Sequence, residues 1–318
     1  IKFTGVAIMI SINHLSITYN KSADILKNIN LNIENGEIIA LLGHNGSGKS
    51  TLIKCISGVL KPTQGCVTFD NINVFENRKK IIPDIGVVFN QKPSFIIDIS
   101  VYDNLLFFKA IYELNNIHFA KNLELIDKYL DVSHLYRKPY RKLSFGERVK
   151  CEIASVLLHS PRYIILDEPT IGLDYNAKKR LYELLLYLNK TQKTTIIIVT
   201  HEVDYIEKIC TRAIILSKGE VHYDGSPNTI IDSLKHTISI TVTYASIRNE
   251  KLAYVILQEA QFEDKEKQLF THHFFYEDEK NAYLEKIIVA FNILEISTGI
   301  ASLREVFENV LQEVQRNK

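Results

Sequence analysis

Short apolar runs alternate with helical patterns through the first two thirds of the chain. The runs are rich in β-branched residues and have strand length, which predicts buried strands of a mostly parallel sheet at residues 38–42, 85–89, 163–166, 195–200 and 213–216. Apolar residues between these runs recur at helical spacing, which predicts helices at residues 101–114, 121–130, 146–158, 177–189 and 203–209. Strands that alternate with helices indicate an α/β domain.

A second group of segments alternates apolar and polar residues instead. Residues 10–19 and 25–33 show this pattern, and the turn signal Asn35-Gly36 follows the second of them. With residues 67–69 they predict an antiparallel β layer that has one face exposed to solvent.

The pattern changes near His236. Strands are predicted at residues 239–244 and 269–276, and helices at 249–260 and 281–293. A last amphipathic helix is predicted at 302–315, with one apolar face formed by Leu303, Val306, Phe307, Val310 and Leu311. The expected organisation is therefore an N-terminal extension (1–9), an α/β domain (10–235) and a small α+β domain (236–318).

Composition narrows the range of functions. The chain has 318 residues and a net charge of +1, so bulk electrostatics do not favour a nucleic-acid partner. Its four cysteines are scattered without a CxxC pair, which favours reduced cysteines in a cytoplasmic protein over a zinc or redox site. No apolar run approaches the roughly 18 residues that span a bilayer, and no secretory signal is recognised.

A phosphate-binding loop follows the predicted strand at 38–42. Residues 43–51 match the pattern G-x-x-x-x-G-K-[ST], and a helical segment comes next. Glycines let the backbone N–H groups turn toward a phosphate chain, and the helix N-terminus adds positive potential. The predicted nucleotide contacts are Gly43, His44, Asn45, Gly46, Ser47, Gly48, Lys49, Ser50 and Thr51, with Lys49 on the β- and γ-phosphates and Ser50 on Mg²⁺.

Two carboxylates end the apolar run at 163–166. A buried parallel strand delivers Asp167 to the sheet edge where nucleotides bind, so Asp167 is a candidate Mg²⁺ ligand. Glu168 is then placed to polarise an attacking water as a general base. Taken by itself, the same segment also fits an ordinary acidic strand end.

Four further segments are uninformative singly but indicate a function when they occur together in a fixed order. Gln91 follows the strand at 85–89, residues 143–147 (Leu-Ser-Phe-Gly-Glu) open a helix, residues 172–174 (Gly-Leu-Asp) follow the two carboxylates, and His201 ends the strand at 195–200. In this order and combination, residues 10–235 resemble the nucleotide-binding subunit of ATP-binding-cassette (ABC) transporters.

The resemblance implies a fold and a set of roles. The expected fold is a P-loop NTPase core with an antiparallel β subdomain and a helical signature subdomain at about 92–158, followed by the small α+β extension. ATP and Mg²⁺ are the implied ligands, with Tyr19 stacking on adenine, Gln91 joining Ser50 and Asp167 at the metal, and His201 contacting the γ-phosphate.

The resemblance also implies partners. In such subunits the signature motif of one copy covers the nucleotide of the other, so Ser144, Gly146 and Glu147 serve the opposite site and Asp174 helps to organise it. A second ATPase subunit and a separate membrane permease are the expected partners. The chain would then lie on the cytoplasmic face of the membrane.

Three residues depart from the usual motifs of the family. His44 occupies a position that is often proline, and its side chain is expected to point away from the phosphates. Phe145 replaces the first glycine of the signature, and Glu147 replaces its glutamine. The wording of the signature and of residues 167–174 looks like a bacterial export-type subgroup, which predicts an exporter.

Two other functions also fit parts of the sequence. The chain could be a soluble ABC ATPase that acts on ribosomes or nucleic acid, or a regulatory NTP-binding module. A single phosphate loop and near-neutral charge argue against the first, and the presence of Glu168 and His201 argues against the second. The apolar segment at 93–97 fits either a permease-docking surface or burial beneath the helices.

Overall fold

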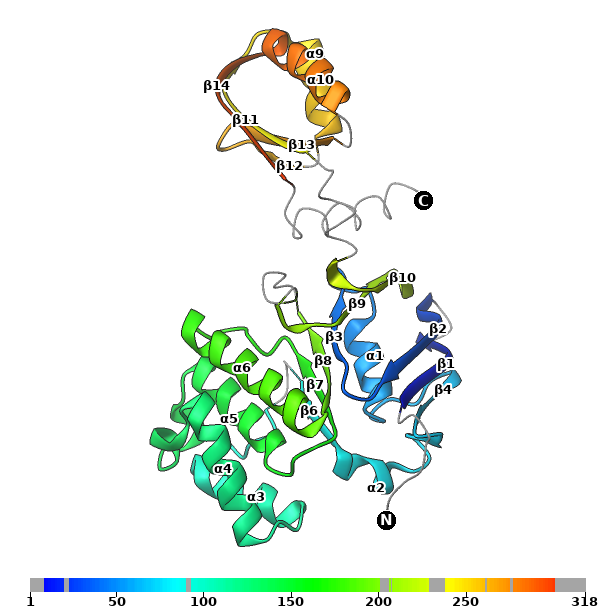
Figure 1. The fold of residues 1–318 in the computed structure, drawn as a ribbon, viewed down its shortest axis with the longest axis vertical. Helices are drawn as coiled ribbons and strands as arrows, with labels where there is room; N and C mark the ends of the chain where they lie inside the picture. Colours follow the sequence, from blue (N-terminus) through cyan, green and yellow to red (C-terminus); the bar gives the residue numbers. More distant parts are fainter. Residues whose placement is uncertain are drawn as a thin grey trace. The chain divides into compact units, whose positions relative to one another are not determined.

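The protein is described by a computed structural model that covers residues 9–19, 23–89, 93–200, 206, 208–228, 238–260, 262–274 and 277–300. The chain divides into two compact units, Ile1–Gly225 and Ser226–Lys318 (Figure 1). Residues 1–8 of the predicted extension and the predicted boundary at 235 and 236 lie outside the described residues, and the first strand begins at Met9.

A six-stranded sheet forms the centre of the first unit, in the order β10-β9-β3-β8-β7-β6. Parallel pairing joins β9 to β3, β3 to β8, β8 to β7 and β7 to β6, which confirms the predicted parallel sheet. The strands are β3 (Ile38–Leu42), β6 (Ile85–Val88), β7 (Tyr163–Asp167), β8 (Thr195–Val199), β9 (Arg212–Ser217) and β10 (Glu220–Gly225). The antiparallel edge strand β10 was not predicted.

A four-stranded antiparallel layer, in the order β2-β1-β4-β5, packs on the same core. It is formed by β1 (Met9–Tyr19), β2 (Ala23–Glu34), β4 (Gln64–Phe69) and β5 (Ile72–Asn73). Ile10 and Leu26 from this layer and Ile39 from β3 belong to one cluster of buried apolar side chains. The predicted antiparallel layer is thereby confirmed.

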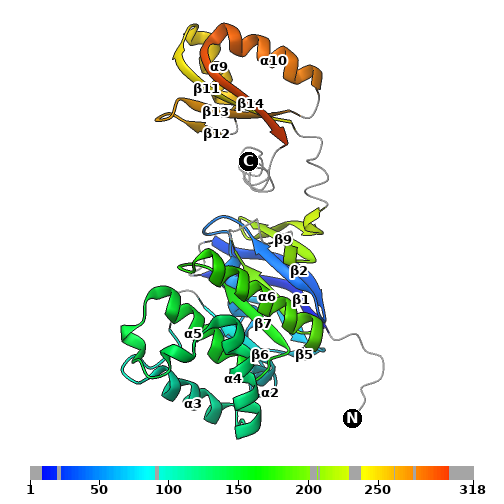
Figure 2. The ribbon, with the colours of Figure 1, turned by 60° about the vertical axis from the view of Figure 1, so that its left-hand side comes forward.

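The helices of the first unit are α1 (Lys49–Ile56), α2 (Arg78–Ile81), α3 (Val101–Ile111), α4 (Asn116–Leu130), α5 (Phe145–Leu157) and α6 (Tyr175–Gln192). Helix α1 lies between the two sheets, whereas α3 to α6 gather on the other side of the six-stranded sheet (Figures 1 and 2). Helix α4 begins five residues before its predicted start at 121, because the Asn115 side chain caps it by accepting from the His118 N–H at 2.8 Å. The predicted helix at 203–209 lies mostly outside the described residues.

The second unit has the order β-α-β-β-α-β, a ferredoxin-like arrangement. Its elements are β11 (Ile238–Ile247), α9 (Glu250–Glu259), β12 (Phe262–Asp264), β13 (Leu269–Phe274), α10 (Glu277–Ala290) and β14 (Phe291–Ile300). The sheet order is β12-β13-β11-β14, and every neighbouring pair is antiparallel. Side chains from the sheet and both helices, including Phe270, Ile287 and Phe291, form its own buried core.

The predicted helix at 281–293 is wrong at its end, because α10 stops at Ala290 and β14 follows without a turn. The pairing of β14 with β11 shifts register between Thr243 and Tyr244, which leaves Leu294 as an extra residue between paired Ile293 and Glu295. This bulge breaks the alternation that identifies a strand. The predicted last helix at 302–315 lies outside the described residues.

Arg212 in β9 forms hydrogen bonds with residues of β10 and β2 and with Glu37. Its Nε and Nη2 atoms donate to Asp224 at 2.5 and 2.7 Å, and its Nη1 donates to the Asn32 carbonyl at 2.7 Å and lies 3.2 Å from Glu37. We expect Arg212→Ala to lower the free energy of unfolding by about 2–3 kcal/mol, because the partly buried guanidinium loses several charge-assisted hydrogen bonds, which contribute about 1.5–3 kcal/mol. The exposed pair of Arg141 with Asp98 is the control, and Arg141→Ala should cost under about 1 kcal/mol. Urea denaturation compares the two variants, and equal losses would contradict this interpretation.

Candidate nucleotide-binding site

The phosphate loop joins the buried strand β3 to helix α1, as the sequence predicts. Gly43 and Gly48 have φ angles of 148° and 106°, which side chains rarely allow. A Cβ atom at Gly43 would lie 2.3 Å from the Leu216 carbonyl oxygen, and one at Gly48 would lie 2.6 Å from the Leu26 side chain. The loop therefore needs glycine at both positions to pack against strands β9 and β2.

Lys49 opens α1 and is only 7% exposed. Its Nζ atom donates to the carbonyl oxygens of Gly43 at 2.6 Å and His44 at 3.0 Å, so the loop holds the ammonium in place. Burial lowers the pKa of Lys49, while the nearby carboxylates of Glu168 and Asp167 oppose that change. The result is a positioned cation with two carboxylates near it.

The two carboxylates lie where β7 ends. Burial raises the pKa of Asp167, and the charge of Glu168 raises it further, whereas Lys49 and a hydrogen bond with the Ser50 side chain lower it. Glu168 adopts a left-handed backbone conformation with φ of 53°, and its N–H donates to the Val199 carbonyl at 2.8 Å. This turn at the strand end places both acidic side chains beside the phosphate loop.

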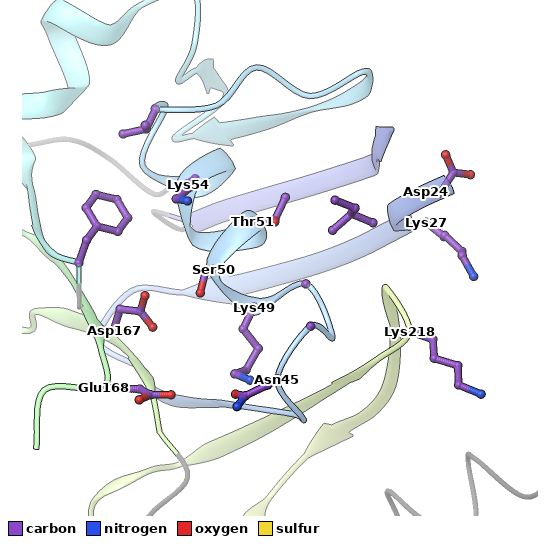
Figure 3. Close-up of a pocket in the computed structure, with 15 residues that line it drawn as sticks. Asp24, Lys27, Asn45, Lys49, Ser50, Thr51, Lys54, Asp167, Glu168 and Lys218 are labelled. Atoms are coloured by element: carbon purple, nitrogen blue, oxygen red, sulfur yellow. The ribbon is translucent and has the colours of Figure 1, made fainter. Parts of the chain in front are cut away.

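These residues line one pocket of about 950 Å³ (Figure 3). Lys49, Ser50, Asp167 and Glu168 lie toward one end of it, and Asp24, Lys27 and Lys218 lie toward the other. The remaining lining residues are Ile25, Asn45, Gly46, Gly48, Thr51, Lys54, Val59 and Phe89. The volume is at the upper end of the range for small-molecule sites, roughly 300–1,000 Å³.

The donor set fits Mg²⁺. The Ser50 hydroxyl and the Asp167 carboxylate are hard oxygen ligands, and they lie next to each other through their hydrogen bond. Among the described residues no cluster of three or more His, Cys, Asp or Glu side chains could hold a metal by itself. Mg²⁺ requires no such cluster, because it commonly takes one or two protein ligands and completes its shell with water and substrate phosphates.

The structure thus brings together most of the predicted loop residues and both predicted carboxylates. Gly43, His44 and Ser47 do not line the pocket, and His44 is exposed. The Ser47 hydroxyl is instead buried beneath Gly43 and has no hydrogen-bond partner among the described residues. Gln91 and His201 lie outside the described residues, and for Tyr19 only the backbone, at the end of β1, is described.

The predicted signature residues lie at the start of α5 and do not line this pocket. Ser144 and Glu147 form a capping box: the Ser144 hydroxyl accepts from the Glu147 N–H at 3.3 Å, and the Glu147 carboxylate accepts from the Ser144 N–H at 2.8 Å. The pKa of Glu147 is lowered by that backbone hydrogen bond and by Lys138, 3.3 Å away. The glutamate that replaces the usual glutamine therefore caps its own helix.

Residues 172–174 pack against this helix start. A Cβ atom at Gly146 would lie 2.4 Å from the Gly172 carbonyl oxygen, and one at Gly172 would lie 2.2 Å from the Phe145 ring. Asp174 caps α6 by accepting from the Ala177 N–H at 2.8 Å. The signature segment and the Gly-Leu-Asp segment thus form one continuous, close-packed surface.

Sequence reasoning missed the contribution of the turn between β9 and β10. Lys218 lines the pocket, and the N–H of Gly219 donates to the Ser47 carbonyl at 3.1 Å. The Lys27 N–H donates to the Gly219 carbonyl at 2.8 Å, so the turn joins the phosphate loop to β2. The Lys-Gly pair is a turn signal, but nothing in the sequence indicates that the turn meets a loop so distant along the chain.

The apolar segment at 93–97 is partly buried and partly exposed. Phe95 is buried, and its ring packs against those of Phe108 and Tyr140 at centroid distances of 5.8 and 5.0 Å. Ile96 and Ile97 remain about half exposed. The segment is anchored by one aromatic side chain and presents two apolar ones to solvent.

The sequence is similar to those of known ATP-binding proteins. The sequence model of the family described as "ABC transporter" matches residues 26–171. The chain is 35% identical, over 70% of its length and 79% of the relative, to the energy-coupling factor transporter ATP-binding protein EcfA2 of Clostridium perfringens. It is 30% identical, over 73% of its length and 89% of the relative, to the ABC transporter ATP-binding protein NatA of Bacillus subtilis.

Solved structures give the same result. CbiO1 from Clostridium perfringens, part of the ABC transporter complex cbiONQ, is similar with a TM-score of 0.63 and 35% identity, covering 71% of this chain and 92% of that one. The ATP-binding cassette MJ0796, a dimer bound to ADP and Pi in a post-hydrolysis state, is similar with a TM-score of 0.62 and 30% identity, covering 68% and 98%. Within the described residues, no helix combines the length and apolar character needed to cross a bilayer.

Proposed function

The chain belongs to the ABC transporter family, and from that premise we propose that this ATPase subunit uses Mg²⁺-dependent ATP hydrolysis to power a separate membrane permease. The observation that carries the proposal is the convergence of Lys49, Asp167 and Glu168 on one pocket at the end of a parallel sheet. Nucleotides bind at that edge in open α/β sheets. The named relatives are ATP-binding subunits of transporters.

Binding of ATP follows from the loop. The N–H groups at the start of α1 and the Lys49 ammonium supply positive potential for the β- and γ-phosphates. A phosphate oxygen can take the place of a loop carbonyl as the acceptor of a Lys49 N–H. The opposite end of the pocket is left for the nucleoside. Tyr19, the residue proposed to stack on adenine, pairs with Ala23 on the neighbouring strand, next to the pocket residue Asp24.

Ser50 and Asp167 would hold Mg²⁺, with Gln91 as the further proposed ligand. When bound, the metal supplies charge neutralisation on the phosphate oxygens. The chain's own residues orient the reaction around it. Asp167 is fixed by its hydrogen bond with Ser50, and its position at the end of a buried strand limits its movement.

Hydrolysis requires a water in line with the bond to the leaving β-phosphate oxygen. Glu168 accepts a proton from that water while the water oxygen bonds to the γ-phosphorus. The bond between the γ-phosphorus and the bridging oxygen breaks, and its electron pair stays on ADP. Lys49 stabilises the charge on the transferred group. His201 is proposed as a hydrogen-bond donor to the γ-phosphate.

The complete site needs a second subunit. Ser144, Gly146 and Glu147 lie outside the pocket of their own chain, as expected if they cover the nucleotide of another copy. The N-terminus of α5 and the Ser144 hydroxyl, which can still donate its proton, would bind the γ-phosphate there. Asp174 stands on the same surface and would organise the opposite site. A homodimer would have two equivalent sites, and a homologous subunit could replace one copy.

ATP hydrolysis by the purified chain tests the chemistry. We expect turnover that requires Mg²⁺ and stops when the metal is chelated. Turnover that is insensitive to chelation would overturn the magnesium site.

A surface for the permease lies on the helical subdomain. The Ile96 N–H donates to the Asn104 side chain at 2.7 Å, which holds the segment against α3. Exposed apolar side chains from the segment and the helix form what we term the α3 apolar surface: Ile96, Ile97, Leu106, Phe107 and Ile111. An apolar area of this kind marks a protein interface, and Gln91 precedes it in the chain. Contact here would link the nucleotide site to permease movement.

Phe107→Asp tests that surface. We expect the purified variant to hydrolyse ATP as the unsubstituted chain does, because Phe107 does not line the pocket. Its recovery with membranes should fall at least about tenfold, since a buried charge at an apolar contact costs more than 1.4 kcal/mol. Ile117→Asp is the control, because Ile117 is 78% exposed at the start of α4 and outside the surface. Undiminished membrane recovery of Phe107→Asp would sink the assignment.

The proposal also covers where the subunit lies and the direction in which the transporter moves its cargo. The subunit would lie on the cytoplasmic face of the membrane and be held there by the permease. Export is the proposed direction, supported by the resemblance of residues 143–148 and 167–174 to export-type subunits. Cargo accumulation in inverted membrane vesicles on addition of ATP would support export, and depletion from them would contradict it.

A further inference from the structure

The last strand of the C-terminal unit has an open edge. Within the described residues, β14 pairs with β11 alone, although it is ten residues long. The other edge strand, β12, has only three residues. In Figure 1, β14 runs along the outer side of this sheet, with α9 and α10 grouped away from that edge. A long unpaired edge presents a row of N–H and C=O groups to any strand that can pair with it.

The side chains along this edge are suited to burial. All six residues from Leu294 to Gly299 are exposed, and Leu294 is 68% exposed. Helix α10 adds exposed Ile288 and Val289 just before the strand. Lysine, arginine and proline, which usually protect an edge, do not occur between residues 291 and 300. Glu295 is the one ionisable residue in this stretch.

We infer that the β14 edge pairs with the β14 edge of a second copy of this chain. The pairing is antiparallel about a two-fold axis and joins the two C-terminal sheets into one eight-stranded sheet. A two-fold interface needs a self-complementary surface, and a strand with a single charged residue, paired with itself, provides one. The inference goes beyond the proposed ATPase, because this contact forms without nucleotide and involves no residue of the nucleotide site.

Charge selects the register. Placing Ser297 on the axis sets Ile296 opposite Thr298 of the second copy and Glu295 opposite its Gly299. The two glutamates then avoid each other, since like charges directly opposite are unfavourable in a sheet. The Cβ position of Gly299 has no atom within 4 Å, which leaves room for the facing glutamate. The bulge at Leu294 ends the regular part of the edge, so pairing covers residues 295–299.

The partner of the β14 edge is a second copy of the chain, because the nucleotide-binding cassette itself is expected to dimerise. The family's cassettes form dimers, as the MJ0796 structure does. Two C-terminal units are therefore brought to high effective concentration on their linkers whenever two cassettes meet. Contact between the units, in turn, would keep the subunits together between rounds of hydrolysis, when the cassettes part.

Disulfide trapping in the full chain without nucleotide tests the contact. Ser297→Cys should cross-link to itself in most of the protein under mild oxidation, because residues that face each other across an axis lie within disulfide distance. Glu266→Cys, in the exposed turn between β12 and β13 at the opposite edge, is the matched control and should not cross-link. The unsubstituted chain, with three buried cysteines and the half-buried Cys66, gives the background.

A second variant separates this contact from the cassette dimer. Ile296→Lys should convert the nucleotide-free dimer to a monomer in light scattering, while Ile296→Lys with Glu168→Gln still dimerises when ATP is added. A monomeric unsubstituted chain without nucleotide, or cross-linking of Ser297→Cys no greater than that of Glu266→Cys, would overturn the inference; the latter is the result expected if residues 301–318 cover the edge. An ATP-induced dimer that fails to form would instead count against the composite site.

Discussion

Glu168→Gln should lower the rate of ATP hydrolysis by about 10²- to 10⁴-fold, which is the range for removal of a general base. The amide keeps the size and shape of the side chain but cannot accept the water's proton. ATP binding should persist, since the loop and Lys49 are unchanged. The variant should therefore accumulate as an ATP-bound cassette dimer. When Ile296→Lys is also present to remove the β14 contact, this dimer should appear as a doubled mass in light scattering with ATP and Mg²⁺.

Glu152→Gln is the matched control for that result. Glu152 is a second partly buried glutamate. It accepts a hydrogen bond from the Tyr140 hydroxyl and lines a smaller cavity of about 220 Å³, which Asp167 and Glu168 also line from their other side. Burial raises its pKa, and its side chain lies outside the nucleotide pocket. Hydrolysis should stay near normal in this variant. Rapid turnover by Glu168→Gln, or an equal loss in Glu152→Gln, would remove Glu168 from its assigned role.

Lys49→Ala should weaken ATP binding by about 10- to 100-fold, because a charge-assisted hydrogen bond to phosphate contributes about 1.5–3 kcal/mol. Hydrolysis at saturating ATP should fall as well, since Lys49 also faces the charge that develops on the transferred group. The substitution leaves the carbonyl oxygens of Gly43 and His44 without their donor. Circular dichroism and thermal unfolding should confirm that the fold survives.

Lys54→Ala is the comparison that separates position from charge. Lys54 lines the same pocket on the next turn of α1, but Lys49 is the lysine that the loop holds through its carbonyl oxygens. Loss of a cation at Lys54 should therefore reduce affinity much less than loss at Lys49. Equal effects, measured by titration with a fluorescent ATP analogue, would mean that general positive charge rather than the loop geometry binds the phosphates.

Much of the nucleotide site could be predicted from local sequence. The phosphate loop is a contiguous motif between a strand and a helix, and the carboxylates end a recognisable apolar strand, so Lys49, Ser50, Asp167 and Glu168 converge as expected. The capping box of Ser144 and Glu147 also had a signal, since serine followed three residues later by glutamate marks a helix start. Glutamate and glutamine can both complete such a capping box, which explains why Glu147 fits a position that is usually glutamine.

Other features depend on contacts between distant segments. Lys218 reaches the pocket only because β9 lies beside β3 in the sheet, an order that no local pattern specifies. β14 was hidden by its bulge: apolar residues at 291, 293, 294 and 296 mix spacings of two and three, which also suits a helix. Residues 291–300 form a strand because they pair with β11, which is distant along the chain.

Affinity capture of tagged Glu168→Gln from native membranes, with ATP and Mg²⁺ present, tests the central claim most directly. The trapped subunit should recover a polytopic membrane protein, and the added substitution Phe107→Asp should abolish that recovery. Recovery of ribosomal or nucleic-acid-bound proteins with nothing from the membrane would contradict the transporter function and favour a soluble ATPase.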